Sequence, residues 1–171
     1  PENAMNSKPT APVSIVSCAD YDLPKVEAAV RRAVDLLGGI GAFVQPGQRV
    51  LLKINLLRPS TPESACTTHP AVVAAVARLV AEAGGHAVIA DSSGGPYQAG
   101  LLRSYYRKSG YTWAAEVSGA ELNEDVASVQ VSHPNGIVLR RLDVIAPLTQ
   151  ADVVINLPKL KTHNLTGLSL A

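Results

Sequence analysis

The sequence predicts an α/β domain: a three-layer sandwich with a mainly parallel, Rossmann-like sheet and one β-hairpin. Short apolar runs, rich in β-branched residues, alternate along the chain with longer segments whose apolar residues repeat at helical spacing. Strands that are apolar throughout are typical of a parallel sheet covered by helices on both faces. An Asn-Gly dipeptide between two alternating segments predicts the hairpin.

Each element has its own local pattern. Pro24 and Pro70 stand where proline is tolerated, in the first turn of a helix, and each helix ends at a Gly-Gly pair. Residues 129–132 and 137–140 flank His133-Pro134-Asn135-Gly136 and form the hairpin, at an edge or as a lid. The predicted strands are 13–18, 49–56, 86–91 and 152–157, and the predicted helices are 24–37, 70–83 and 98–108, with a helical turn near Trp113.

The composition and charge of the chain argue against several classes of protein. The 171 residues suit one domain, and 47% hydrophobic with 17% charged residues argue against disorder. A net charge of +1 without a basic cluster argues against nucleic-acid binding. No apolar run approaches the roughly 20 residues of a membrane span. Two cysteines, Cys18 and Cys66, favour a reducing cytoplasm and are too few for a four-thiolate iron–sulfur cluster.

The two ends of the chain differ from the rest. Residues 1–8, with Met5 inside them, indicate a tag remnant and a disordered start before a single domain at 9–171. The last residues, 168–171, are apolar and carry no cap, which predicts an interrupted element at the C-terminal end. The same apolar end is a candidate surface for a homo-oligomer or a docking domain.

Candidate ligand-binding residues cluster where predicted strands end, because ligands bind outside the carboxyl ends of an open parallel sheet. Lys53 and Asn55 share one face of their strand, although Lys53 could also reach past the sheet end into solvent. Thr67, Thr68 and His69 precede the helix that begins at Pro70, where free N–H groups favour an anion. The alternative is that Thr68 or His69 only caps this helix.

Two further strand ends carry polar residues. Asp91 and Ser92 suit a metal, a ribose or an amine, or an Asx-turn that caps the next helix. Lys159, Lys161 and His163 alternate after the last strand and would share one face if that segment is extended. Three such groups repel one another unless an anion lies between them, and crowding lowers a lysine pKa as base or imine chemistry requires. A solvated basic loop is the alternative.

A metal site is also conceivable. His69, Asp91 and His163 together would supply two imidazoles and a carboxylate, a set that holds a divalent cation. Cys66 precedes Thr67 and has no identified base, so it is expected to be unreactive.

Four motifs follow one another along the chain: residues 50–56, Thr67-Thr68-His69-Pro70, Asp91-Ser92 and residues 155–163. Together they resemble the domain of unknown function 362 family, whose members often carry a ferredoxin-like cluster domain further along the chain. The resemblance runs from about Val13 to Ala171, and this chain has no cluster-binding cysteines. A more distant likeness is to the nickel-pincer lactate racemase superfamily. That likeness implies that Lys159 or Lys161 holds a cofactor or substrate, while His69 and His163 move protons or bind metal.

Two functions follow as hypotheses. The first is an enzyme domain that binds a small anionic molecule, a carboxylate or phosphate, and uses lysine and histidine for catalysis. The second is a non-catalytic module of an iron–sulfur redox protein whose cluster domain is absent from this chain.

Overall fold

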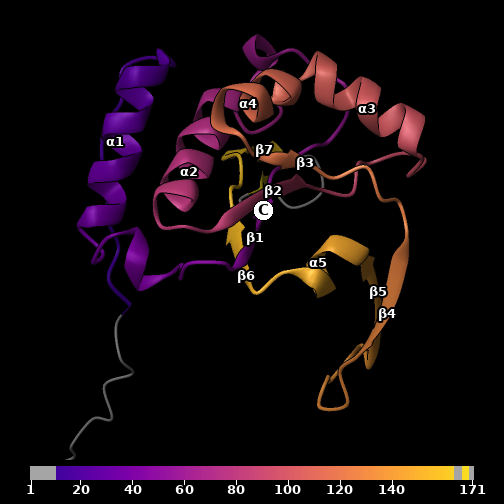
Figure 1. Ribbon diagram of the computed structural model, residues 1–171. Helices are drawn as coiled ribbons and strands as arrows, with labels where there is room; N and C mark the ends of the chain where they lie inside the picture. Colours follow the sequence, from indigo (N-terminus) through magenta and orange to yellow (C-terminus); the bar gives the residue numbers. More distant parts are fainter. Residues whose placement is uncertain (1–10, 164–166, 170–171) are drawn as a thin grey trace, which may run out of the picture.

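The computed structural model describes residues 11–163 and 167–169. The predicted tag remnant and the final residues Leu170 and Ala171 lie outside the described residues. The described chain forms an α/β fold, as the sequence predicts, with helices above a central sheet and a hairpin arm that projects from the body (Figure 1).

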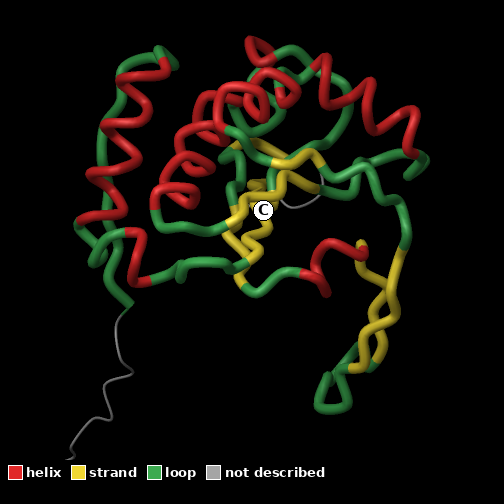
Figure 2. The backbone as a smooth tube through the Cα atoms, viewed as in Figure 1, coloured by secondary structure: helices red, strands yellow, loops and turns green. Residues whose placement is uncertain are grey.

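The central sheet has four strands in the order β3-β2-β1-β6, and all three pairings are parallel. Figure 2 shows these strands at the centre of the molecule. Three of them match apolar runs, whereas the two-residue β3 carries no run that predicts a strand. The strands are β1 (Arg49–Lys53), β2 (His86–Ala90), β3 (Glu121–Leu122) and β6 (Val153–Asn156).

Four helices pack on one side of the sheet and one short helix lies on the other (Figure 1). The main core lies beneath the four-helix side, where Leu52 and Ile89 of the sheet meet Val73, Tyr106 and Tyr111 of the helices. The helices are α1 (Leu23–Asp35), α2 (Pro70–Glu82), α3 (Ala99–Lys108), α4 (Tyr111–Ser118) and α5 (Ala146–Gln150), with 3-10 turns at Ile40–Ala42 and Pro62–Ser64.

Proline and glycine shape the predicted helices. Proline stands in the first turn of both α1 and α2, as the sequence predicts. Gly84 ends the α2 turn with a φ of +78°, and a Cβ on Gly85 would lie 2.8 Å from Val44 Cγ1. Only glycine at 85 therefore lets the chain turn from α2 into β2 at this separation.

Two predictions about the elements are wrong. Residues 13–18 form no strand but run as an extended segment along α1, with the Ser14 hydroxyl donating to the Ala33 carbonyl at 2.7 Å. The hairpin exists, but its second arm is β5 (Arg141–Ile145) rather than 137–140, opposite β4 (Ser128–Ser132). This register places Val129 opposite Val144 and Val131 opposite Leu142, so apolar cross-strand pairs outweigh the Asn-Gly turn preference.

The chain after β6 forms a second antiparallel pair, β7 (Lys161–His163) with β8 (Gly167–Ser169). The segment 159–163 thus contains the extended backbone that the alternation of basic residues predicts. The chain turns back before β7, so β7 lies at the carboxyl edge of the sheet, where Lys161 contacts Asn55 just after β1.

Candidate functional site at the carboxyl edge of the sheet

The register of the sheet brings three strand ends together. Lys53 closes β1 and stands between Ala90 of β2 and Asn156 of β6. Asp91 follows directly, and its Oδ1 lies 3.4 Å from Lys53 Nζ. The lysine and the carboxylate from separate predicted motifs therefore form an ion pair.

Asp91 is buried and shared among several donors. Its Oδ2 accepts the Leu56 N–H at 2.7 Å, and its Oδ1 accepts the Ser92 N–H at 3.0 Å. Burial raises the pKa of Asp91, and these hydrogen bonds together with the Lys53 charge oppose that rise. Asp91 therefore pairs with a lysine of this chain, whereas the predicted Asx-turn that caps the next helix is not formed, because Gln98 stands at the N-cap of α3.

A cavity of about 270 Å³ opens onto this pair. Its floor contains Lys53, Asp91 and Ser92, and the hairpin supplies Ser128 and Asp143 from the other side. The rest of its wall is apolar and consists of Leu51, Val144, Ile145 and Leu148. The hairpin therefore forms one wall of a pocket at the strand ends.

Thr68 ties the strand ends to one another. Its hydroxyl accepts the Asn55 N–H at 2.9 Å and donates to the Leu157 carbonyl at 2.5 Å. Its own carbonyl accepts the Tyr111 hydroxyl at 2.7 Å. The neighbouring Thr67 is buried, and within the described residues its hydroxyl makes no hydrogen bond. Both threonines thus lie beneath the site surface, and the geometry gives Thr68 a positioning role.

His69 caps α2. Its Nδ1 accepts the Ala71 N–H at 3.2 Å, and its carbonyl accepts the N–H groups of Val72 and Val73. The first N–H groups of the helix are therefore already bonded, which corresponds to the capping alternative from the sequence. Burial lowers the pKa of His69, the Lys159 charge lowers it further, and Glu63 opposes this shift.

The His69 ring stacks on Tyr21, with ring centroids 3.7 Å apart and an interplanar angle of 10°. Lys159 Nζ lies 3.4 Å from the Tyr21 hydroxyl oxygen and 5.9 Å from the ring centroid. Tyr21 was missed in the sequence because nothing in its local pattern indicates a contact across 48 or 138 positions.

Lys161 is the most constrained lysine of the site. Its ammonium donates to Asn55 Oδ1 at 2.6 Å and to the Cys66 carbonyl at 2.7 Å. Burial lowers the pKa of Lys161, the Lys159 charge adds to that effect, and Asp91 opposes it. Because an ammonium has three N–H groups, these two bonds leave one N–H group without a hydrogen-bond partner among the described residues.

The predicted metal ligands do not converge. Within residues 11–163 and 167–169, no group of three His, Cys, Asp or Glu side chains is placed to hold a metal ion. His69 already uses Nδ1 for its cap, and His163 in β7 is exposed. The trio of His69, Asp91 and His163 is therefore not assembled as a site. The two cysteines are both free thiols, so a four-thiolate cluster would need ligands from elsewhere.

The profile of a domain of unknown function, DUF362, matches residues 50–171, which include every strand end described above. The chain belongs to the DUF362 family. A thylakoid-associated protein of Synechocystis sp. is 39% identical over 151 residues, covering 88% of this chain. The chain spans 45% of that relative's length. No solved structure matches the DUF362 chain in the same way.

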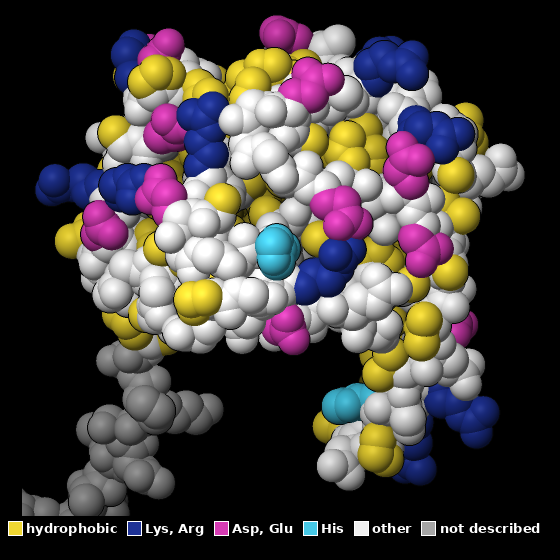
Figure 3. Space-filling model, in the orientation of Figure 1, with side chains coloured by type: hydrophobic (Ala, Val, Ile, Leu, Met, Phe, Trp, Pro, Cys, Tyr) yellow, Lys and Arg dark blue, Asp and Glu magenta, His cyan; other side chains and the backbone are white. Residues whose placement is uncertain are grey.

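The helices and the surface charge bear on what the molecule can contact. None of the helices in the described part of the chain is long and apolar enough to cross a bilayer. Basic and acidic side chains are interspersed over the face shown in Figure 3, and neither sign forms a continuous patch there.

Proposed function

We propose that this DUF362 domain binds a small anionic molecule, a carboxylate or phosphate, at the carboxyl edge of its sheet. The observation that carries the proposal is the half-buried ammonium of Lys161, which is held by two hydrogen bonds and has one N–H group without a partner among residues 11–163 and 167–169. Lys159 adds positive charge near Lys161, and Lys53 adds a further cation at the same edge, where it pairs with the carboxylate of Asp91. An anion relieves the repulsion among these cations.

The surrounding residues have supporting roles. Asn55 and the Cys66 carbonyl orient Lys161, and Thr68 fixes Asn55 through its backbone N–H. Ser92 supplies a hydroxyl at the adjacent cavity. A lysine with a lowered pKa is also what proton transfer requires, so we include lysine- and histidine-based catalysis by Lys159, Lys161 and His163 in the proposal.

The test is calorimetric titration with inorganic phosphate and, separately, with malonate. Lys161→Met should weaken binding of at least one of them about 10- to 100-fold, because a charged hydrogen bond contributes roughly 1.5–3 kcal/mol. Lys108→Met is the matched control, since Lys108 lies in the last turn of α3, away from the strand ends. Equal affinity for both probes in wild type and Lys161→Met would refute the proposal.

Location and partners belong to the same proposal. We place the chain in the cytoplasm, as its cysteine content favours, and note that thylakoid association is stated for the Synechocystis relative. Association through the C-terminal apolar end stays a prediction, because Leu170 and Ala171 lie outside the described residues.

A further inference from the structure

The outer edge of β6 has no neighbouring strand in the part of the chain that the structure describes. Within the described residues, β6 pairs with β1 on one side only. A strand in this position leaves alternate N–H and C=O groups available for another strand. A cavity of about 440 Å³ runs along β6, and Val34, Val76 and Leu79 supply apolar side chains from α1 and α2. The edge therefore offers both backbone groups and an apolar wall.

The extended segment 13–18 has a sequence that favours a strand, but in the described residues it pairs with none. Its sequence is rich in β-branched residues that favour strands. Yet in the described part of the chain no backbone hydrogen bond joins residues 11–21 to another segment. Val13 and Ile15 are 81% and 90% exposed. This segment thus has a strand sequence without a strand partner.

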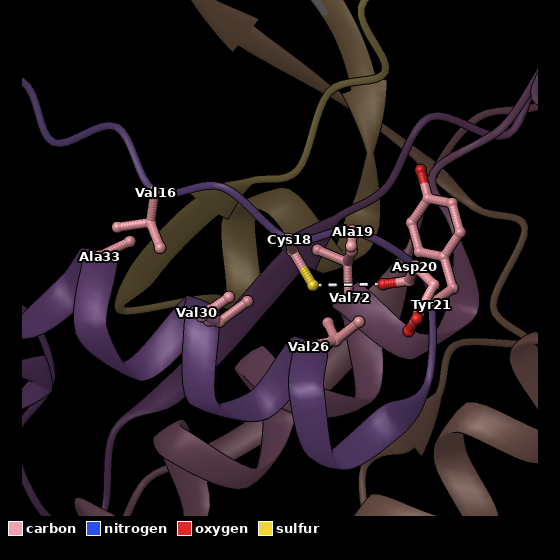
Figure 4. Close-up of a pocket in the computed structure, with 10 residues that line it drawn as sticks. Val16, Cys18, Ala19, Asp20, Tyr21, Val26, Val30, Ala33 and Val72 are labelled. Atoms are coloured by element: carbon pink, nitrogen blue, oxygen red, sulfur yellow. Dashed lines mark hydrogen bonds between the residues drawn. The ribbon is translucent and has the colours of Figure 1, made fainter.

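The segment runs in the same direction as β6. Ser14 bonds to Ala33 in the last turns of α1, near the amino edge of the sheet, and Tyr21 stacks on His69 at the carboxyl edge. Figure 4 shows this course, from Val16 beside Ala33 to Tyr21 at the far end of the same helix. A strand formed here would be parallel to β6.

The segment and β6 face the same helices. Val16 and Cys18 line a cavity of about 530 Å³ together with Val72 of α2 (Figure 4). Val72, Val76 and Leu79 follow one another at helical spacing on α2, and the last two line the cavity along β6. The two cavities are therefore neighbouring parts of one gap beneath the α1–α2 pair.

We propose that residues 13–18 add to the outer edge of β6 as a fifth parallel strand and close this gap. The order becomes β3-β2-β1-β6 followed by 13–18. The connection through α1 then reaches β1 in the same direction, and on the same face, as the connection from β1 through α2 to β2. Both crossovers consequently have the same hand, as parallel connections require.

The exposure of side chains agrees with this pairing. Because Val16 and Cys18 face the helices, strand alternation places Val13 and Ile15 on the opposite face. Val154 of β6 lies on that face too and is 44% exposed. Pairing brings these apolar side chains together and buries part of their surface.

The added strand also bears on the candidate site. Tyr21 follows the segment by three residues and holds the stacked ring of His69. Pairing of 13–18 fixes the chain that leads into Tyr21, so it orders one wall of the site. The pairing of 13–18 with β6 is the same whichever ligand the site binds.

Disulfide trapping tests the pairing directly. In a Cys18→Ser and Cys66→Ser background, Ile15→Cys combined with Val154→Cys should form an intramolecular disulfide under mild oxidation, read by mass spectrometry and non-reducing electrophoresis. Neighbouring strands lie about 4.8 Å apart, within the range that a disulfide spans. Ile15→Cys with Val129→Cys is the control, because Val129 lies in the hairpin arm, and it should stay reduced.

Two more cysteine pairs test other registers of the added strand: Val13→Cys and Ser17→Cys, each combined with Val154→Cys. One of the three pairs should form the disulfide efficiently. Hydrogen exchange supplies a second readout: Ile15→Pro should speed exchange of amides in β6 at least 10-fold, whereas Ile15→Thr should not. Disulfides found only between two chains would assign the edge to a second copy and overturn the proposal. Absence of any disulfide, with unchanged β6 exchange in Ile15→Pro, would overturn it as well.

Discussion

Removal of the Thr68 hydroxyl should destabilise the whole carboxyl edge. In Thr68→Val the side chain keeps its shape, but the Asn55 N–H loses its acceptor and the Leu157 carbonyl loses its donor. Each such bond contributes about 0.5–1.5 kcal/mol, and each buried group left unpaired costs about 1–3 kcal/mol. Thr68 is 4% exposed, so water cannot easily replace the hydroxyl. The expected loss in the free energy of unfolding is about 2–4 kcal/mol.

Urea denaturation followed by circular dichroism measures this loss. Thr68→Ser is the matched control because it keeps the hydroxyl, and it should cost only about 1 kcal/mol for the missing methyl group. If Thr68→Val and Thr68→Ser destabilise the protein equally, the hydroxyl does not tie the strand ends and the reasoning fails. A loss below about 0.5 kcal/mol in Thr68→Val would have the same meaning.

Other predictions concern titration and buried hydroxyls. The pKa of His69 is lowered from 6.5, so its contribution to stability is complete above pH 6.5 and is lost as pH falls through the folded value, when Nδ1 can no longer accept the Ala71 N–H. Between pH 7.5 and pH 5, the free energy of unfolding should fall by about 1 kcal/mol more in the wild type than in His69→Asn, because asparagine caps the helix at both pH values. Denaturation at the two pH values measures this difference, and equal losses in the two proteins would contradict the prediction. Tyr106→Phe should be neutral or stabilising, because within the described residues its hydroxyl is buried without a partner. Tyr111→Phe should cost about 1 kcal/mol, because its hydroxyl donates to Thr68, and thermal unfolding of both variants distinguishes them.

Local patterns predicted most of the fold. Proline at the helix starts, Gly-Gly at the ends and apolar runs between them are enough to place α1, α2, β1, β2 and β6, since each pattern acts within a few residues. They could not place β3, which has only two residues, Glu121 and Leu122, and is held by pairing with β2. The second strand of the hairpin lies at 141–145 rather than at the predicted 137–140, because cross-strand apolar pairs decide the register. Those pairs depend on both strands at once, so no single segment predicts them.

The site was predictable only in part. Lys53 and Asp91 end neighbouring parallel strands, so their closeness follows from topology. The contact between Lys161 and Asn55 spans 106 positions and depends on how β7 turns back, which no local pattern specifies. Tyr21 and the hairpin residue Asp143 were missed for the same reason, because tertiary packing brings them to the strand ends.

The hairpin arm has a practical consequence. Its strands leave the body together, and the loop between Ser132 and Arg141 carries Ile137 and Val138 almost fully exposed to solvent (Figure 1). Loop tips of this kind tolerate insertions and are the first places that proteases cut. A fluorescent label or short epitope at the tip should leave the sheet intact while reporting, through Asp143 in the middle of β5, on anything that enters the adjacent cavity.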